Sequence, residues 1–228
     1  MSKKLALASA FVLCLTILSS AAWADNIPIA NPSFESAVPF SIPCGVGCAY
    51  NYGPIPGWTT IKGAGTWQPG SYFSSIPDGS LVAFATPSNT LAQTLTGTSV
   101  MANSVYTLNV YVGDRTDAIN GIYTLSLDTI VGGVTNTLCS FTGDASTIAL
   151  GTFQLEGCSY TSGSNVPSGN LYLLFDAVTG QLDVDNVSLT VQPTSVPEPS
   201  SVLLLGVGML LLLATFAARR KQKLQFTA

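Results

Sequence analysis

Between residues 104 and 112 the chain reads Ser104-Val105-Tyr106-Thr107-Leu108-Asn109-Val110-Tyr111-Val112. In an extended strand the apolar side chains from Tyr106 to Val112 point to one face, while Thr107 and Asn109 point to the other. A period of two residues is typical of a β-strand with one buried face. This stretch therefore predicts a strand, and the same pattern recurs through most of the chain.

Short strands of this kind follow one another along residues 25–192 at intervals of roughly ten residues, separated by Gly, Pro, Asn, Ser and Thr. The other predicted strands are Leu81–Ala85, Leu91–Leu95, Gly121–Asp128, Val134–Phe141, Thr147–Leu155, Leu171–Phe175 and Leu182–Val191. No helix-length stretch of this segment has an amphipathic helical period. We therefore predict an all-β fold, a single β-sandwich over residues 25–192. Within it, the Gly-, Pro- and Ser-rich segment Ser36–Ser80 is expected to form long loops.

The N-terminus has the pattern of a secretory signal peptide. Lys3-Lys4 forms a short basic region, Leu5–Leu18 is apolar, and Ala22-Trp23-Ala24 fits a small-x-small cleavage pattern. The apolar stretch is short for a membrane span. We expect residues 1–24 to be removed on export, and a retained membrane anchor is the alternative.

The C-terminus has three parts in a fixed order. Val196-Pro197-Glu198-Pro199 is followed by an apolar run from Val202 to Ala218 and then by Arg219-Arg220-Lys221-Gln222-Lys223. At about 1.5 Å per residue the apolar run reaches roughly 26 Å, which is enough to cross the core of a bilayer. We predict a Pro-rich linker at 193–201, a transmembrane helix at 202–218 and a basic tail at 219–228 that stays in the cytoplasm.

Together these parts resemble the PEP-CTERM sorting signal of bacterial surface proteins. The resemblance implies that an exosortase-type membrane protease recognises Pro197, Glu198 and Pro199, with Arg219 and Arg220 on the far side of the helix. Two prolines hold an extended segment that can enter a protease groove. The resemblance also implies brief anchoring in the inner membrane of a Gram-negative bacterium. Transfer to the cell surface or matrix would follow, where such proteins accompany exopolysaccharide and biofilm. An ordinary C-terminal anchor is the alternative.

Charge and composition exclude several classes of function. Of the eight cationic residues only Lys62 and Arg115 lie within residues 25–192, together with eleven of the twelve acids, so this segment has a net charge near −9. Such an acidic domain is not expected to bind nucleic acid through phosphate contacts. The chain has no histidine, which excludes a Ser-His-Asp triad, a Cys-His pair and the usual zinc sites. Carboxylates remain available for divalent cations or for acid chemistry.

The cysteines predict two disulfides. Cys14 leaves with the signal peptide, and Cys44, Cys48, Cys139 and Cys158 remain. An even number of cysteines in an exported chain is typical of disulfide bonding. We expect the pairs Cys44–Cys48 and Cys139–Cys158, because each pair falls within one loop or hairpin. A metal site at the first pair is the alternative.

Two motifs frame the predicted sandwich. Asn31-Pro32-Ser33-Phe34-Glu35 and Pro56-Gly57-Trp58 lie near its start, and Leu182-Asp183-Val184-Asp185-Asn186-Val187 lies near its end. Together they resemble the two ends of galactose-binding-like jelly rolls, a group that includes carbohydrate-binding modules. In that fold a structural Ca²⁺ ties the first strand to the last. Carried over, the resemblance makes Glu35 and Asp185 calcium ligands, helped by backbone carbonyls near Asn31.

The last predicted strand supplies a physical reason for calcium. By alternation Asp183 and Asp185 share a face with Val187, Leu189 and Val191, which have a core-facing pattern, so Asp185 is expected to point inward. A buried carboxylate is costly unless it is paired, and Ca²⁺ takes carboxylate and carbonyl oxygens. The alternative is a solvated strand end with Asn186 in a turn.

Aromatic residues crowd into the loop-like segment 50–73. They are Tyr50, Tyr52, Trp58, Trp67, Tyr72 and Phe73. Flat rings can stack on the C–H face of a sugar, and Tyr and Trp add polar edges. We expect Trp58 to plug the end of the sandwich. Trp67, Tyr72 and Phe73 are candidates for ligand binding, and the alternative is that they also pack into the end of the sandwich.

These features predict an exported, calcium-stabilised, non-catalytic surface protein that contacts extracellular polysaccharide. The alternative is an enzyme, since the same motifs resemble secreted cyanobacterial cyclases that act on indole terpenoids. There a carboxylic acid on the last strand supplies a proton, and the matching positions here are Asp183 and Asp185. These two acids lie roughly 6.5 Å apart along a strand, a spacing that also admits an inverting glycosidase.

Overall fold

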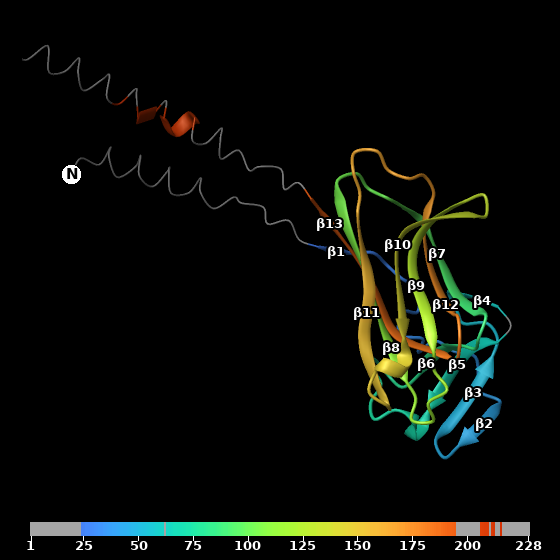
Figure 1. Cartoon of the computed structure of the whole chain (residues 1–228). Coiled ribbons are helices and arrows are strands. Elements are labelled where there is room, and N and C mark those ends of the chain that lie inside the picture. The colour runs from blue at the N-terminus through green and yellow to red at the C-terminus, as the bar shows by residue number, and fades with distance from the viewer. Residues whose placement is uncertain (1–23, 62, 195–205, 210, 213–214, 216–228) are drawn as a thin grey trace, which may run out of the picture. The chain divides into compact units, whose positions relative to one another are not determined.

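Two antiparallel sheets lie face to face in the structure, a computed structural model that describes residues 24–61, 63–194, 206–209, 211–212 and 215. Residues 24–193 form one unit, the β-sandwich that the strand pattern predicts (Figure 1). The predicted signal peptide, the sorting motif 197–199, Arg219, Arg220 and most of the predicted helix 202–218 lie outside the described residues. The described part of segment 206–215 is helical. No helix within the described ranges is long and apolar enough to cross a membrane.

The larger sheet has eight strands. Its order is β11 (Thr152–Thr161), β8 (Ser104–Asp114), β13 (Leu182–Pro193), β6 (Val82–Ala85), β5 (Ala64–Pro69), β3 (Cys48–Tyr52) and β2 (Ile42–Gly45), and β1 (Asp25–Asn26) pairs with β13. The smaller sheet runs β10 (Val134–Asp144), β9 (Ile122–Val131), β12 (Asn170–Ala177), β7 (Asn89–Ser99) and β4 (Thr59–Thr60). Two short 3₁₀ helices, η1 (Gly70–Tyr72) and η2 (Ala145–Thr147), lie between strands.

The hydrophobic core lies between the two sheets. Tyr106, Leu108, Val110 and Val112 of β8 are all fully buried there, as their alternation predicts. They meet the inward side chains of the smaller sheet, among them Leu125, Leu127, Leu171, Leu173 and Phe175. Burying each such side chain contributes roughly 1.5–3 kcal/mol relative to leaving it in water. Trp58 packs into this core against Phe34 and Phe175, as expected.

The last strand departs from the predicted alternation. The pairing of β13 with β8 shifts register between Asp185 and Ser188, and Asn186 has a positive φ of 46°. This β-bulge inserts a residue and reverses the side-chain direction beyond it. Val187 and the later apolar residues therefore face the core, whereas Asp183, which lies opposite Phe84, faces the outer side of the larger sheet. The prediction that Asp183 and Asp185 share the face of Val187, Leu189 and Val191 is wrong for this reason.

The segment Ser36–Ser80 is not only loop. It contains β2, β3, β4, β5 and η1: β2, β3 and β5 build one side of the larger sheet, and β4 forms an edge of the smaller sheet. These strands are short, and β2 and β5 contain Gly and Pro, so little alternation is visible in the sequence. The predicted strand Thr147–Leu155 is also displaced, to Thr152–Thr161. The Asp144 carboxylate accepts a hydrogen bond from Ser146 N at 3.0 Å, and this cap starts η2 in place of a strand.

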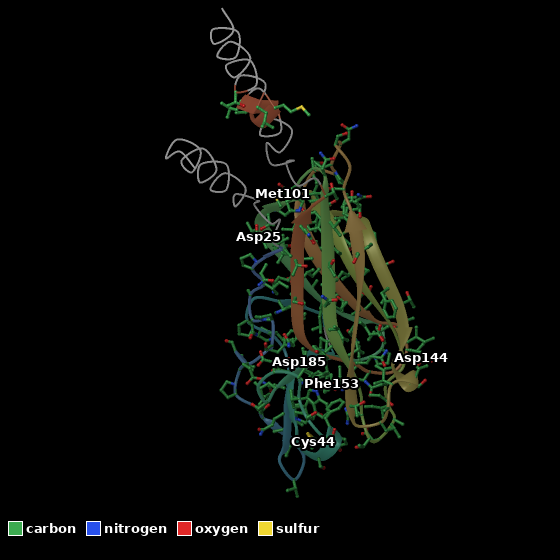
Figure 2. All side chains as sticks on the ribbon, turned by 90° about the vertical axis from the view of Figure 1, so that its left-hand side faces the viewer. Asp25, Cys44, Met101, Asp144, Phe153 and Asp185 are labelled. Atoms are coloured by element: carbon green, nitrogen blue, oxygen red, sulfur yellow. A yellow bond between two sulfur atoms is a disulfide. The ribbon has the colours of Figure 1, made fainter. Side chains whose placement is uncertain are left out.

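A second cluster covers the outer face of the larger sheet. Its members, the outer aromatic cluster, are Cys48, Trp67, Phe73, Val82 and Phe84, with Cys44, Tyr50, Tyr72, Ile76 and Phe153 packed against them. Gly113 makes room for it, because a Cβ there would come within 2.8 Å of the Phe73 and Phe153 rings. Asp185, Phe153 and Cys44 lie toward one end of the sandwich, and Met101 and Asp25 lie toward the other (Figure 2).

Both predicted disulfides form. Cys44–Cys48 closes the β2–β3 hairpin, and Cys139–Cys158 joins β10 of one sheet to β11 of the other. The second bond therefore ties together the edge strands of two different sheets. It spans 19 residues of sequence, against 4 for the first.

Loss of the Cys139–Cys158 bond is expected to destabilise the domain more than loss of the Cys44–Cys48 bond. A loop of this length constrains the unfolded chain by about 3 kcal/mol. The double variant Cys139→Ser/Cys158→Ser should lower the free energy of unfolding by about that amount in denaturant titrations, and Cys44→Ser/Cys48→Ser should lower it less. Equal losses from the two variants would contradict this account.

Candidate functional site

A pocket of about 190 Å³ opens on the outer face of the larger sheet. It is lined by Cys44, Tyr50, Tyr52, Trp67, Phe84, Arg115 and Gln181. Four of these side chains are aromatic and come from three neighbouring strands, β3, β5 and β6. The pocket is therefore a hollow within the outer aromatic cluster and does not reach the core between the sheets.

Strand register brings the aromatic walls together. Tyr50 lies opposite Trp67, while Tyr52 and Phe84 lie opposite the two sides of Gly65. A Cβ at Gly65 would collide with the Asn51 carbonyl, so only glycine fits between these strands. Without a side chain at Gly65, the rings of Tyr52 and Phe84 approach to 5.5 Å between centroids. Tyr50, Tyr52 and Phe84 meet edge to face at 69° to 90°, which forms a rigid apolar corner.

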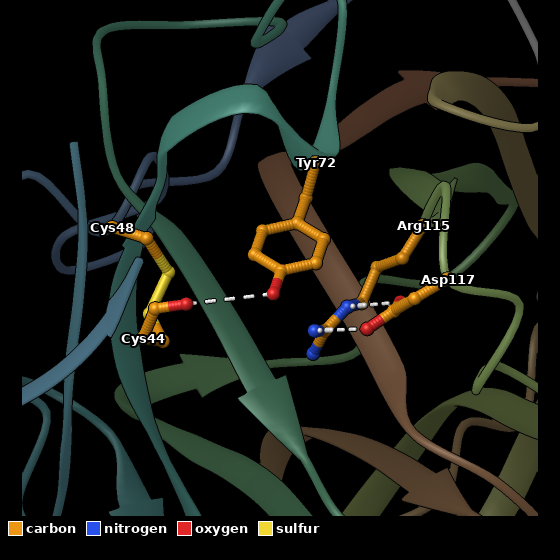
Figure 3. Close-up of a disulfide and its surroundings, with 5 residues drawn as sticks. All are labelled: Cys44, Cys48, Tyr72, Arg115 and Asp117. Carbon is orange, nitrogen blue, oxygen red and sulfur yellow. Dashed lines mark hydrogen bonds and ion pairs between the residues drawn. A yellow bond between two sulfur atoms is a disulfide. The ribbon is translucent and has the colours of Figure 1, made fainter. Parts of the chain in front are cut away.

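Arg115 forms the polar wall of the pocket. Its guanidinium carbon lies 4.5 Å from the ring centroids of both Trp67 and Tyr72. Arg115 also donates from Nε and Nη2 to the two oxygens of Asp117, at 3.0 and 2.8 Å (Figure 3). Its side chain is only 11% exposed, and it is the only cationic side chain that the structure describes. Two rings and a bidentate ion pair therefore fix its position.

Asp183 lies behind the pocket and is completely buried. It accepts hydrogen bonds from Gln181 Nε2 and Asn120 Nδ2, both at 2.8 Å. Burial raises the pKa of Asp183 to about 6, although these amide donors, Arg115 and Trp67 oppose the rise. Trp67 Nε1 is buried and has no hydrogen-bond partner among the described residues. Asp183 does not line the pocket, and its contact with Gln181 fixes the amide that does.

Two of the three predicted calcium ligands come together. Asp185 is fully buried and accepts hydrogen bonds from Asp78 N and Asn186 N at 2.8 and 2.7 Å. Glu35 accepts from Ser80 N and Leu81 N on the loop that carries Asp78. Burial raises the pKa of Asp185 to about 7, and the negative charges of Asp78 and Glu35 add to the rise. These three acids therefore lie within electrostatic reach of one another.

Asn31 is placed differently. Its side-chain amide donates to the carbonyls of Ser36 and Pro56, and its own carbonyl accepts from Trp58 Nε1. The neighbouring Pro32 carbonyl accepts from Val187 N and so ties this loop to β13. Within the described ranges no group of three or more Cys, Asp or Glu side chains is close enough to hold a metal ion. A cation at Glu35 and Asp185 would therefore need carbonyl or hydroxyl oxygens as further ligands.

The three predicted ligand-binding aromatics have different positions. Trp67 lines the pocket, Tyr72 holds Arg115 and donates to the Cys44 carbonyl at 3.5 Å, and Phe73 is buried against Phe153. Sequence reasoning missed Phe84, Arg115 and Gln181 as wall residues. The sequence shows that Arg115 is one of only two cationic residues among eleven acids in residues 25–192. No local sequence pattern predicts that it lies beside Trp67 of β5.

A family model described as HpiC1 cyclase matches residues 25–190, and the model of the PEP-CTERM protein-sorting motif matches residues 195–221. No curated protein matches.

Among solved structures, the chain is similar to carbohydrate-binding modules. The CBM22-1 xylan-binding domain of Paenibacillus barcinonensis Xyn10C shares 14% identity, covers 77% of this chain and all of that chain, and has a TM-score of 0.47. A CBM4 structure shares 11% identity over 72% of this chain and all of that chain, with a TM-score of 0.44. TmCBM61, solved with β-1,4-galactotriose, shares 15% identity over 72% of this chain and 97% of that chain, with a TM-score of 0.41.

Proposed function

The chain belongs to the HpiC1-like family, whose model is described as a cyclase, and we propose that this member is a non-catalytic surface protein whose pocket holds one sugar ring of an extracellular polysaccharide. Its PEP-CTERM motif indicates export and sorting to the surface, and implies processing by an exosortase. In our proposal the chain is held briefly in the inner membrane of a Gram-negative bacterium by residues 202–218. It then reaches the cell surface or the matrix.

The pocket is the observation that carries the proposal. Tyr52 lines the pocket and is 49% exposed, so part of its ring is open to a ligand, while Arg115 and Gln181 line the same pocket with hydrogen-bonding groups. This combination suits a sugar, which has an apolar C–H face and a polar edge. The volume of about 190 Å³ is below the roughly 300–1,000 Å³ of pockets that enclose a whole drug-sized ligand. One ring fits such a space better than a fused polycyclic substrate.

The positions of the carboxylates support a non-catalytic role. A general acid must come within hydrogen-bond distance of the atom that it protonates. Asp183 and Asp185 are both completely buried, and neither lines the pocket. No Asp or Glu is among the described residues that form its walls. A bound sugar would meet aromatic rings, a guanidinium and an amide, which bind but do not transfer protons near neutral pH.

We further propose that Ca²⁺ stabilises the domain at Glu35 and Asp185. The donor chemistry supports this, because Asp185, Glu35 and Asp78 repel one another at neutral pH and the one described ion pair lies elsewhere, at Arg115. Both carboxylates keep lone pairs beyond the amide donors that they accept. The ion would supply positive charge and tie the loop 31–36 to β13. It takes no part in ligand binding in this proposal.

Tyr52→Ala is expected to weaken binding of the recognised saccharide about tenfold, since it removes a stacking face and its apolar area. The measurement is a glycan array followed by calorimetric titration of the best ligand. Val46→Ala is the matched control, because Val46 is 98% exposed at the tip of the same hairpin and does not line the pocket. A folded protein that binds no saccharide would contradict the proposed function.

Acid catalysis by Asp183 is the second candidate. One observation favours it: the pKa of Asp183, raised to about 6, is suitable for a general acid near neutral pH. Gln181, which lines the pocket, donates a hydrogen bond to this carboxyl. This candidate would be established if the purified domain rearranges an indole terpenoid and the Asp183→Asn variant does not. The same assay with Asp185→Asn would separate the two acids.

A further inference from the structure

The charge of Arg115 is largely cancelled where it borders the pocket. Asp117 takes two of its N–H groups in a bidentate ion pair, and the Asp183 carboxyl acts on it from behind. A guanidinium has five N–H donors, so three remain for other partners. Arg115 therefore offers hydrogen-bond donors to the pocket without a net positive field around them.

This ion pair differs from an ordinary surface pair, which contributes little. Arg115 cannot swing away, because it is 11% exposed and lies over the rings of Trp67 and Tyr72. Asp117, its partner, is more open to solvent, with 37% of its side chain exposed. Without Asp117, the pocket would present a rigid guanidinium on an aromatic wall, an arrangement that suits bidentate recognition of a carboxylate.

We propose that Asp117 makes the pocket selective for neutral sugars over sugars that carry a carboxylate, such as uronic acids. This inference rests on the proposed saccharide-binding function. A carboxylate on the ligand would meet a guanidinium whose charge Asp117 already balances, and it would be repelled by Asp117, by Asp183 and by the net charge of the domain, near −9. A hydroxyl group needs only one free N–H and meets no such repulsion.

The test compares saccharides that differ only in charge. The affinity of the protein is measured by titration for a uronic acid oligomer and for the same oligomer after its carboxyl groups have been reduced to alcohols. The pair of measurements is repeated for several types of sugar. Wild-type protein should bind at least one neutral member about tenfold or more tighter than its acidic counterpart. Asp117→Asn should reduce this ratio by about tenfold, mainly by improving binding of the acidic member. That gain should disappear as salt is raised, since it is electrostatic.

Asp25→Asn is the matched control. It removes the same charge from an exposed site on β1, at the end of the sandwich away from Cys44 (Figure 2), and should leave the ratio unchanged. Asp117→Ala serves as a second variant. Wild-type protein that binds both members equally, or an unchanged ratio in both Asp117 variants, overturns the inference alone. A folded wild type that binds neither member overturns the proposed function, and this inference with it.

Discussion

Trp67→Ala is expected to abolish saccharide binding and to lower the free energy of unfolding by about 3–5 kcal/mol. Trp67 is only 2% exposed, and its ring contacts Tyr72 and Phe73 at 5.6 and 5.9 Å between centroids. It also forms one of the two faces that hold Arg115. Its loss therefore leaves a cavity, releases the guanidinium and removes a wall of the pocket in a single step.

The matched control for this variant is Trp58→Ala. Trp58 is also buried, at 6% exposed, but it packs in the main core against Phe34 and Phe175. Its loss should cost a similar amount of stability and leave binding intact at a temperature where circular dichroism shows a folded protein. Trp67→Phe, which keeps a ring over Arg115, should show an intermediate effect. If Trp67→Ala binds like the wild type, or if Trp58→Ala loses binding equally, the pocket is not the binding site.

The sequence predicted the layers of the fold because they depend on local alternation. The buried face of β8 is the clearest case, since Tyr106, Leu108 and Val110 fall two residues apart and all enter the core. The strands from β2 to β5 were missed for the opposite reason. They have two to six residues and pair across the sheet, so their stability comes from neighbours and leaves little local pattern.

The bulge in β13 shows a different limit. A single residue, Asn186 with a positive φ, decides whether Asp183 and Asp185 face the core or the outer side of the sheet. Asparagine tolerates this conformation but does not require it. A strict alternation therefore gave the right strand and the wrong face for both acids. The burial of Asp185 was predicted correctly, but this side chain is buried on the outer side of the larger sheet, where Asp78 N donates to it, and not in the main core.

The candidate site was predictable only in part. The crowding of Tyr50, Tyr52 and Trp67 in one segment was visible, and the structure brings all three to the pocket. Arg115 and Gln181 come from loops beside β8 and β13, far away in sequence, and strand order alone brings them to β5. Pairs of residues that meet through topology leave no periodic signal in a single sequence.

Chelation of calcium is expected to reverse the pH dependence of stability. In EGTA, the pKa values of Asp185 and Asp183, about 7 and about 6 in the folded state, exceed the ordinary aspartate value of 3.8. The folded state then binds protons that the unfolded state has already lost. Stability from these groups is complete below pH 4 and falls as the pH rises toward 7.

Bound Ca²⁺ requires the ionised carboxylates, so with calcium the protein should become more stable over the same range of pH. Without calcium, the Asp185 contribution should fall by a few kcal/mol from pH 4 to pH 7, or about 5–10 °C in melting temperature. The measurement compares wild type and Asp185→Asn by thermal melting between pH 4.5 and 8, with EGTA and with Ca²⁺. The difference between the two proteins isolates this group, because the asparagine side chain does not titrate. If the melting temperature of the wild type is the same with and without calcium at every pH, the proposed calcium site is wrong. A pH dependence that is present in the wild type and absent from Asp185→Asn would still confirm that Asp185 is a buried acid with a raised pKa.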